Sequence, residues 1–179
     1  TFIAERVSKL PIDAIIASPY ARAKETAEII AQKINKPIEW SELFVERKQP
    51  SELIGKSFDD PLKRTIFDLT RTHADDPGWK YSDEESFLDL KTRAEAALAL
   101  LVVRKEEHLL VVTHGLFKRL LIGSMIFGAD FNSLQYKMFR SFFYTSNTGI
   151  TVCDHLLPDE EHPEPRWELI TWNDHAHLG

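Results

Sequence analysis

Two apolar runs in this chain deliver polar side chains to the start of a helical pattern. The run Leu109–Val112 is followed by Thr113, His114 and Gly115, where a new helical pattern begins. In open, mostly parallel sheets, ligands bind beyond the carboxyl ends of the strands, where helix N-termini direct N–H groups toward them. His114 is therefore a candidate catalytic or binding residue. The alternative is a solvated histidine that merely caps the helix.

The second run, residues 13–17, leads into another predicted helix start. Ser18 is the expected N-cap, Pro19 the first helical residue, and Arg22 lies in the first turn. A cation in the first turn opposes the partial positive charge of the helix N-terminus unless an anion lies in front of it. The alternative is that Arg22 pairs on the surface with a carboxylate such as Glu25.

Both runs would act together if they belong to one sheet. Arg22 and His114 would then face the same crevice, with two helix N-termini beside them. A guanidinium fork, a histidine and helix N-termini suit a phosphate group. We therefore predict a phosphate site at this edge of the sheet.

Apolar runs alternate with helical patterns along the chain, which indicates a layered α/β fold. Three further strands are predicted at residues 37–40, 149–152 and 167–172. Helices are predicted at residues 21–33, 87–105 and 116–127, the last ending at Gly128.

Composition narrows the class of protein. The 179 residues are 43% hydrophobic, enough for one enzyme-sized domain. A formal net charge of −6 argues against a nucleic-acid surface, and no apolar run reaches the ~20 residues of a membrane span. The lone Cys153 forms no internal disulfide and fits a reducing compartment, so a cytoplasmic location is expected.

Four segments together resemble one enzyme family. Residues 18–27 carry the pattern Ser-Pro-x-x-Arg-Ala-x-x-Thr-Ala, and residues 111–115 read Val-Val-Thr-His-Gly. Residues 84–87 are similar to a Gly-Glu-Ser segment in which Glu84 replaces the glycine, and residues 173–178 end in Asn-Asp-x-x-His-Leu. In order and spacing these pieces resemble the histidine phosphatase superfamily, also called phosphoglycerate mutase-like, over essentially the whole chain. The tail is similar to that of its broad-specificity phosphatase branch.

This resemblance implies a fold and a reaction. The fold would be a three-layer α/β/α sandwich with a mostly parallel sheet, as a single domain over residues 1–179. The reaction would be hydrolysis of phosphate monoesters through a phosphohistidine. Arg22, Ser18 and Gly115 would bind the substrate, and His114 would hold the phosphoryl oxygens as a catalytic residue.

By the same resemblance, Glu46 would supply the general acid, which protonates the leaving oxygen. The alternative is an ordinary surface residue beside Arg47. Glu85 is the second candidate for a catalytic carboxylate near the pocket. Glu84, where the family has glycine, is expected to adopt the local backbone conformation at a cost.

The chain departs from the family in one respect. The family's first strand ends in Arg-His-Gly and carries the nucleophilic histidine, but none of the seven histidines here lies in that context. By resemblance the missing strand lies in the middle of the sheet, where its loss would expose unpaired backbone groups. We therefore expect a preceding segment, or a neighbouring chain in a homodimer, to supply it. The truncated chain alone is not expected to catalyse the reaction.

Residues 47–83 form a long insertion between Glu46 and Glu85 that is expected to cover the substrate. It contains a helical stretch at residues 61–73 and the aromatic residues Phe58, Phe67, Trp79 and Tyr81. These side chains either line a pocket or pack the insertion onto the body, and packing is the expectation for Phe67.

No metal or cofactor is expected. The spacing of the late histidines fits no tetrahedral metal site; these are His155, His162, His175 and His177. The expected partners are a small phosphorylated substrate and inorganic phosphate. Two other functions stay open: an inactive module that binds phosphorylated ligands or other proteins, and a phosphoglycerate mutase-type transferase. The tail segment favours the phosphatase over the mutase.

Overall fold

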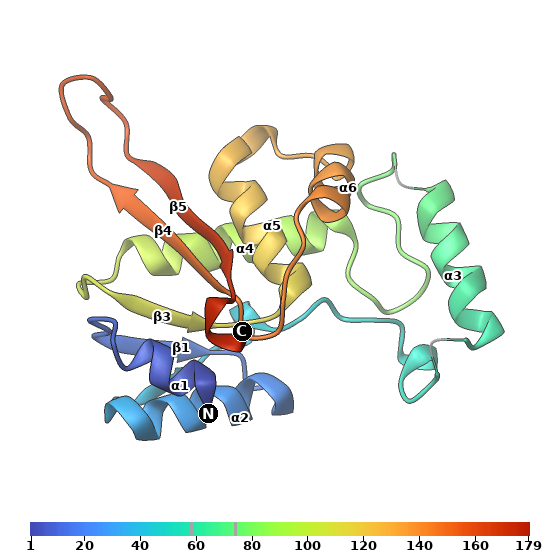
Figure 1. Cartoon of the computed structure of the whole chain (residues 1–179). Coiled ribbons are helices and arrows are strands. Elements are labelled where there is room, and N and C mark those ends of the chain that lie inside the picture. Colours follow the sequence, from blue (N-terminus) through green and yellow to red (C-terminus); the bar gives the residue numbers. More distant parts are fainter. Residues whose placement is uncertain (58, 74) are drawn as a thin grey trace.

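A parallel sheet lies at the centre of the molecule (Figure 1). The computed structural model describes residues 1–57, 59–73 and 75–179. Its strands have the order β2 (Ile38–Trp40), β1 (Ala14–Ala17) and β3 (Leu109–Val112), and Ile15 of β1 lies opposite Ile38 and Leu110. Each strand begins within one residue of its predicted start and ends at its predicted last residue. The predicted α/β class is confirmed.

Alternate residues of β1 point to two separate hydrophobic cores, as the period of two of a strand requires. Ile15 packs with Val7 and Ile30 on one face, whereas Ile16 packs with residues such as Leu90 on the other. The helices form a layer on each side of the sheet (Figure 1), namely α1 (Phe2–Val7) and α2 (Ala21–Ile34) below it and α4 (Phe87–Val102) and α5 (Gly115–Phe127) above it. The three-layer arrangement is therefore as predicted.

The two late strands form a separate antiparallel ribbon, β4 (Ile150–Leu156) with β5 (Arg166–Asp174). Both strands are longer than predicted. Among the described residues, β3 has β1 as its strand partner and β4 has β5, so each presents a second edge without a strand. An extra strand in the sheet remains a prediction.

The start of α2 differs from the prediction. The helix begins at Ala21 with Tyr20 as N-cap, so the assignments of Ser18 as N-cap and Pro19 as first helical residue were wrong. Ser18 instead continues the strand, because its N–H donates to the carbonyl of Val112 at 2.9 Å. In addition, α4 ends at Val102, three residues before the predicted end.

Helix α6 (Ser133–Phe142) was not predicted. Its N-terminus carries a capping box in which the side chains of Asn132 and Gln135 each accept from the backbone N–H of the other. Four single-turn 3₁₀ segments complete the described elements: η1 (Glu42–Phe44), η2 (Ser51–Leu53), η3 (Gly128–Asp130) and η4 (Ala176–Leu178).

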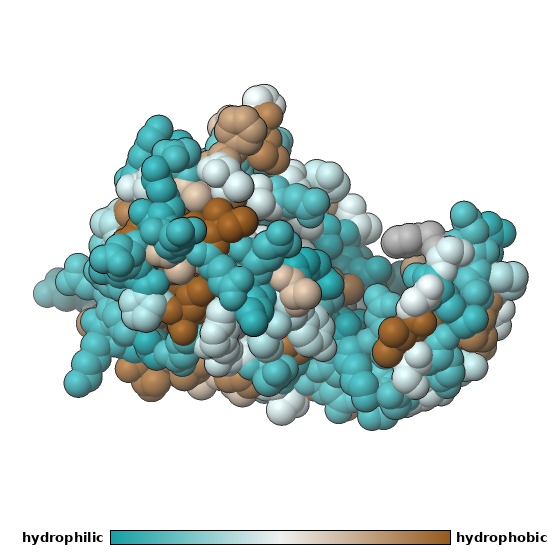
Figure 2. All heavy atoms as spheres, turned by 90° about the horizontal axis from the view of Figure 1, so that it is seen from below, coloured by the Kyte–Doolittle hydropathy of each residue, from teal (hydrophilic) through white to brown (hydrophobic). Residues whose placement is uncertain are grey.

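The insertion forms a lobe on the side toward which β3 points (Figure 1), built around α3 (Pro61–Thr72). Figure 2 shows this lobe beside the body, with a largely hydrophilic surface and scattered apolar patches. Phe67 is 62% exposed on α3, so the expectation that it packs onto the body was wrong. Trp79 stacks on His73 with ring centroids 4.7 Å apart, and Phe58 lies outside the described residues.

Each helix that the structure describes falls short of the length and apolarity needed to cross a membrane.

Candidate active site

Two strand ends meet at Ser18 and His114. Because β1 and β3 are parallel, their carboxyl ends lie at one edge of the sheet, and the residues that follow are neighbours. The Ser18 Oγ and His114 Nε2 atoms are 2.8 Å apart, and both side chains are buried. The hydroxyl also accepts from the N–H of Tyr20 at 3.3 Å. Ser18 thus fixes the orientation of the imidazole.

Burial sets the charge of His114. The residue is the N-cap of α5, is 5% exposed and has the ring of Tyr20 edge-on at 5.6 Å. Burial, with the positive charges of Arg22 and Arg93, lowers the pKa of His114 from 6.5 to about 4. The imidazole is therefore neutral at pH 7 and has one N–H to donate.

Removal of the Ser18 hydroxyl is a direct test of this pair. Ser18→Ala leaves His114 Nε2 without its partner in a buried place, which should destabilise the fold by about 1 to 3 kcal/mol. Urea unfolding measures the change. Ser8→Ala is the matched control, because the Ser8 hydroxyl bonds at the exposed end of α1. Equal stability of the two variants would contradict the role given to Ser18.

Arg22 lies in the first turn of α2 and is 65% exposed along its side chain. Its Nη2 atom is 3.9 Å from Oε2 of Glu46. In the described part of the chain the carboxylate paired with Arg22 is Glu46, so the alternative pairing with Glu25 was wrong. The positive charge of its guanidinium acts on His114.

Glu46 is held at the N-terminus of α5. Its Oε1 atom accepts from the N–H of Phe117 at 3.2 Å and from the N–H of Arg47 at 3.1 Å. The carboxylate thus meets the partial positive charge of the helix. The alternative of an ordinary surface residue is wrong, because the side chain is only 21% exposed and faces Arg22.

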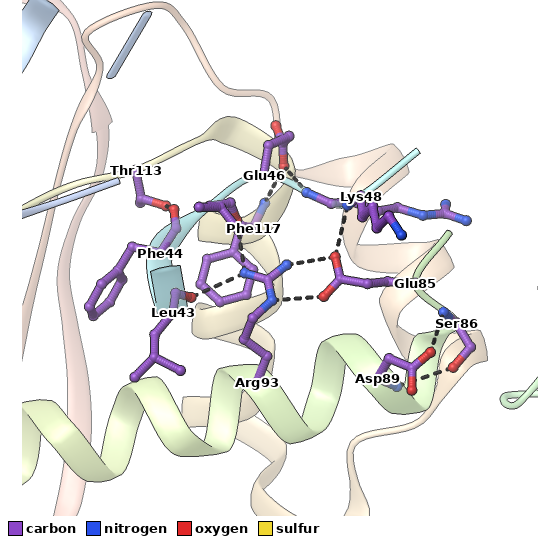
Figure 3. Close-up of polar contacts among 12 residues, drawn as sticks. Leu43, Phe44, Glu46, Lys48, Glu85, Ser86, Asp89, Arg93, Thr113 and Phe117 are labelled. Carbon is purple, nitrogen blue, oxygen red and sulfur yellow. Dashed lines mark hydrogen bonds and ion pairs between the residues drawn. The ribbon is translucent and has the colours of Figure 1, made fainter. Parts of the chain in front are cut away.

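The Glu85 carboxylate forms an ion pair with Arg93 of α4 (Figure 3). Arg93 donates from Nε and Nη2 to the two carboxylate oxygens, each at 2.8 Å, and the N–H of Lys48 donates to Oε2 at 2.8 Å. The Nη1 atom of Arg93 also donates to the carbonyls of Leu43 and Val45. Arg93 and Glu85 therefore hold the segment that carries Glu46 from both sides.

Glu84 holds the same segment. Its Oε2 atom accepts from Nη2 of Arg47 at 2.8 Å, and its Oε1 atom accepts from the N–H of Tyr81 at 2.9 Å. Glu84 is 4% exposed, and its φ is not positive, so the expected backbone cost of replacing glycine was wrong. The Arg47–Glu84 ion pair joins the Glu46 segment to the end of the insertion.

Gly115 begins α5 beside His114. A Cβ atom at this position would lie 2.8 Å from Oγ1 of Thr145, so a larger residue here would force the Thr145 hydroxyl to move. Neither Thr145 nor Arg93 was predicted. Both reach the site from distant parts of the chain, and no local pattern marks them.

The family model of the histidine phosphatase superfamily (branch 1) matches residues 2–175. The chain belongs to the histidine phosphatase superfamily. This confirms the family to which the sequence motifs pointed, while the roles of individual residues remain predictions. The comparison with curated proteins gave no match.

Solved structures share the fold of this histidine phosphatase family member. Bacillus stearothermophilus YhfR is similar with a TM-score of 0.77 and 22% identity, over 99% of this chain and 82% of that one. A mycobacterial glucosyl-3-phosphoglycerate phosphatase in complex with inorganic phosphate has a TM-score of 0.75 and 17% identity, over 99% of this chain and 84% of that one. A phosphoserine phosphatase mutant from Entamoeba histolytica, in complex with phosphoserine, has a TM-score of 0.68 and 23% identity, over 99% of this chain and 81% of that one.

Proposed function

We propose that the protein is a phosphatase that hydrolyses small phosphate monoesters through a phosphohistidine. The observation that carries the proposal is the convergence of Arg22, Glu46 and His114 at the N-terminus of α5. A cation, a neutral imidazole and helix N–H groups suit a phosphoryl group, and a carboxylate beside them suits proton transfer to an ester oxygen. Relatives with this fold include phosphatases that bind phosphate or phosphoserine.

The proposed reaction has two steps. A histidine nitrogen attacks phosphorus while the ester P–O bond breaks, and Glu46, as the acid, gives its proton to the leaving oxygen. Water then attacks phosphorus, the N–P bond breaks, and Glu46 takes a proton from the water. Arg22, Ser18, His114 and Gly115 bind the phosphoryl oxygens, whose charge they stabilise.

In this scheme the nucleophile is a second histidine, because His114 is assigned to the phosphoryl oxygens. Among the described residues, His114 is the histidine that contacts Ser18 and lies near Arg22. An extended segment along the free edge of β3, from the same protein or a neighbouring copy, would bring the second one. Trapping the phosphoenzyme with an aryl phosphate and mapping the modified histidine by mass spectrometry tests this. A phosphate on His114 would overturn the assignment of roles.

Binding of inorganic phosphate tests the site itself. Arg22→Ala and His114→Gln are each expected to weaken phosphate binding about tenfold or more, because each removes a hydrogen bond to a charged ligand. Lys24→Ala and His108→Gln are matched controls, since Lys24 also lies on α2 and His108 lies at the opposite end of β3. Calorimetry measures the affinities. Unchanged affinity in both site variants would contradict the proposal.

A phosphate-binding protein without turnover is the second candidate. It is favoured by one observation, that the described residues bring a single histidine to Arg22 and Ser18. Turnover of an aryl phosphate that His114→Gln abolishes supports the phosphatase. Phosphate binding without turnover supports the second candidate.

A further inference from the structure

The loop formed by residues 145–149 lies against the start of α5. Thr145 approaches Gly115 so closely that a Cβ atom there would be 2.8 Å from its Oγ1. Thr145 is half-buried, and within the described structure its hydroxyl makes no hydrogen bond. The hydroxyl therefore lies beside Gly115, the first residue of α5, whose N–H has no acceptor within the helix.

Asn173 holds this loop in place. Its side chain is buried, with Oδ1 accepting from the N–H of Ser146 at 2.8 Å and Nδ2 donating to Ser146 Oγ at 3.3 Å. Its own N–H donates to Oγ1 of Thr151 at 3.1 Å. Asn173 has φ 52°, a left-handed conformation that asparagine and glycine tolerate best. These contacts fix the residue adjacent to Thr145.

Two more side chains hold the other end of the loop. His177 Nε2 and Thr148 Oγ1 are 3.0 Å apart. Lys118 of α5 donates from Nζ to the carbonyl of Gly149 at 3.4 Å and to Thr151 at 3.1 Å. The loop is thus tied both to the C-terminal segment and to the helix whose N-terminus forms the site.

We propose that Thr145 is a further substrate-binding residue, whose hydroxyl donates to a phosphoryl oxygen, and that Asn173 is its positioning residue. The proposal rests on the proposed function, because it places the phosphoryl group at the N-terminus of α5. Asn173 acts through Ser146 and does not touch the ligand. The rival explanation is that Thr145 only fills space against Gly115 and that Asn173 only stabilises the fold.

Substitutions of Thr145 separate these explanations. Thr145→Val keeps the shape and removes the hydroxyl, and we expect inorganic phosphate to bind about fivefold to tenfold more weakly, as measured by calorimetry. Thr145→Ser keeps the hydroxyl and is expected to bind as the wild type does. Wild-type affinity in Thr145→Val would overturn the proposal.

Asn173→Gly tests the positioning role. Glycine keeps the left-handed conformation but removes both side-chain contacts with Ser146. We expect phosphate binding to weaken about as much as in Thr145→Val, and the double variant to bind no more weakly than Thr145→Val alone. A purely structural role would instead lower the melting temperature and leave the affinity unchanged. That result would overturn the role of Asn173.

Gly115→Ala gives an independent measurement if Asn173→Gly does not fold. The added Cβ atom displaces the Thr145 hydroxyl, so phosphate binding should weaken in the wild type. In a Thr145→Ala background the same change meets no hydroxyl, so the further loss of affinity should be smaller than in the wild-type background. Equal losses in both backgrounds would overturn the proposal.

Arg22→Ala and His114→Gln distinguish failure of the Thr145 proposal from failure of the proposed phosphate site. Loss of phosphate binding in these variants, with wild-type affinity in Thr145→Val, rejects the role of Thr145 alone. Unchanged affinity in Arg22→Ala and His114→Gln rejects the site on which both proposals depend.

Discussion

Arg93→Ala is expected to destabilise the protein by about 3 to 5 kcal/mol, the usual cost of breaking a buried ion pair. The side chains of Arg93 and Glu85 are 13% and 18% exposed, so the Glu85 carboxylate would lose its partner in a poorly hydrated place. The carbonyls of Leu43 and Val45 would lose a donor. Contact of the guanidinium with the ring of Phe117, centred 4.1 Å away, would be lost too. Urea unfolding measures the change.

Two control variants separate the effect of the planar guanidinium of Arg93 from the effect of its charge. Arg93→Lys keeps the charge but has no planar fork, so its stability should lie between those of the wild type and Arg93→Ala. Lys48→Ala removes an exposed ion pair with Asp83 and should leave the unfolding midpoint nearly unchanged. A loss in Arg93→Ala no larger than that in Lys48→Ala would contradict the structural role of Arg93.

His114 should make the stability of the fold depend on pH. Its pKa is about 4 in the folded protein, whereas the unfolded chain has the ordinary histidine value of 6.5. Between these values the unfolded chain binds more protons, so stability rises with pH. The contribution is fully present above about pH 7 and is lost as the pH falls to about 4. At about 1.36 kcal/mol per pH unit, the loss amounts to about 3 kcal/mol.

Unfolding by urea at a series of pH values tests this prediction. His114→Gln has no titrating imidazole, so its stability should fall less steeply than that of the wild type between about pH 7 and pH 5, before most carboxylates titrate. Parallel profiles for the wild type and His114→Gln would show that His114 does not carry the effect.

Local patterns in the sequence were sufficient for the central elements and insufficient for α6. The strands at Ala14–Ala17 and Leu109–Val112 are short apolar runs between turn signals, and the long helices have apolar residues at helical spacing. In α6, by contrast, Leu134 and Met138 lie on the exposed side, so its apolar residues do not mark a single buried face.

The site residues also fall into two groups, those that the sequence pattern could place and those that it could not. Ser18, Arg22 and His114 follow strand ends, so topology alone brings them to one edge. Glu46 was placed by resemblance, but its contact with the N-terminus of α5 joins residues 71 apart. Arg47 and Glu84 are 37 residues apart, and their pairing depends on how the insertion folds back. Such long-range pairs leave no periodic signal.

The Arg47–Glu84 pair limits how the insertion can be exchanged between relatives. Arg47 is the first residue of the insertion, whereas Glu84 is the residue that follows its last one. The boundary at residues 83 and 84 therefore separates the two members of the pair. A chimera that replaces residues 47–83 would keep Glu84, a buried carboxylate, and lose the cation that compensates it. Transplanting a new lobe onto this scaffold therefore requires a matched residue at position 84. Without one, the graft would disturb the segment that carries Glu46, whatever the new lobe itself binds.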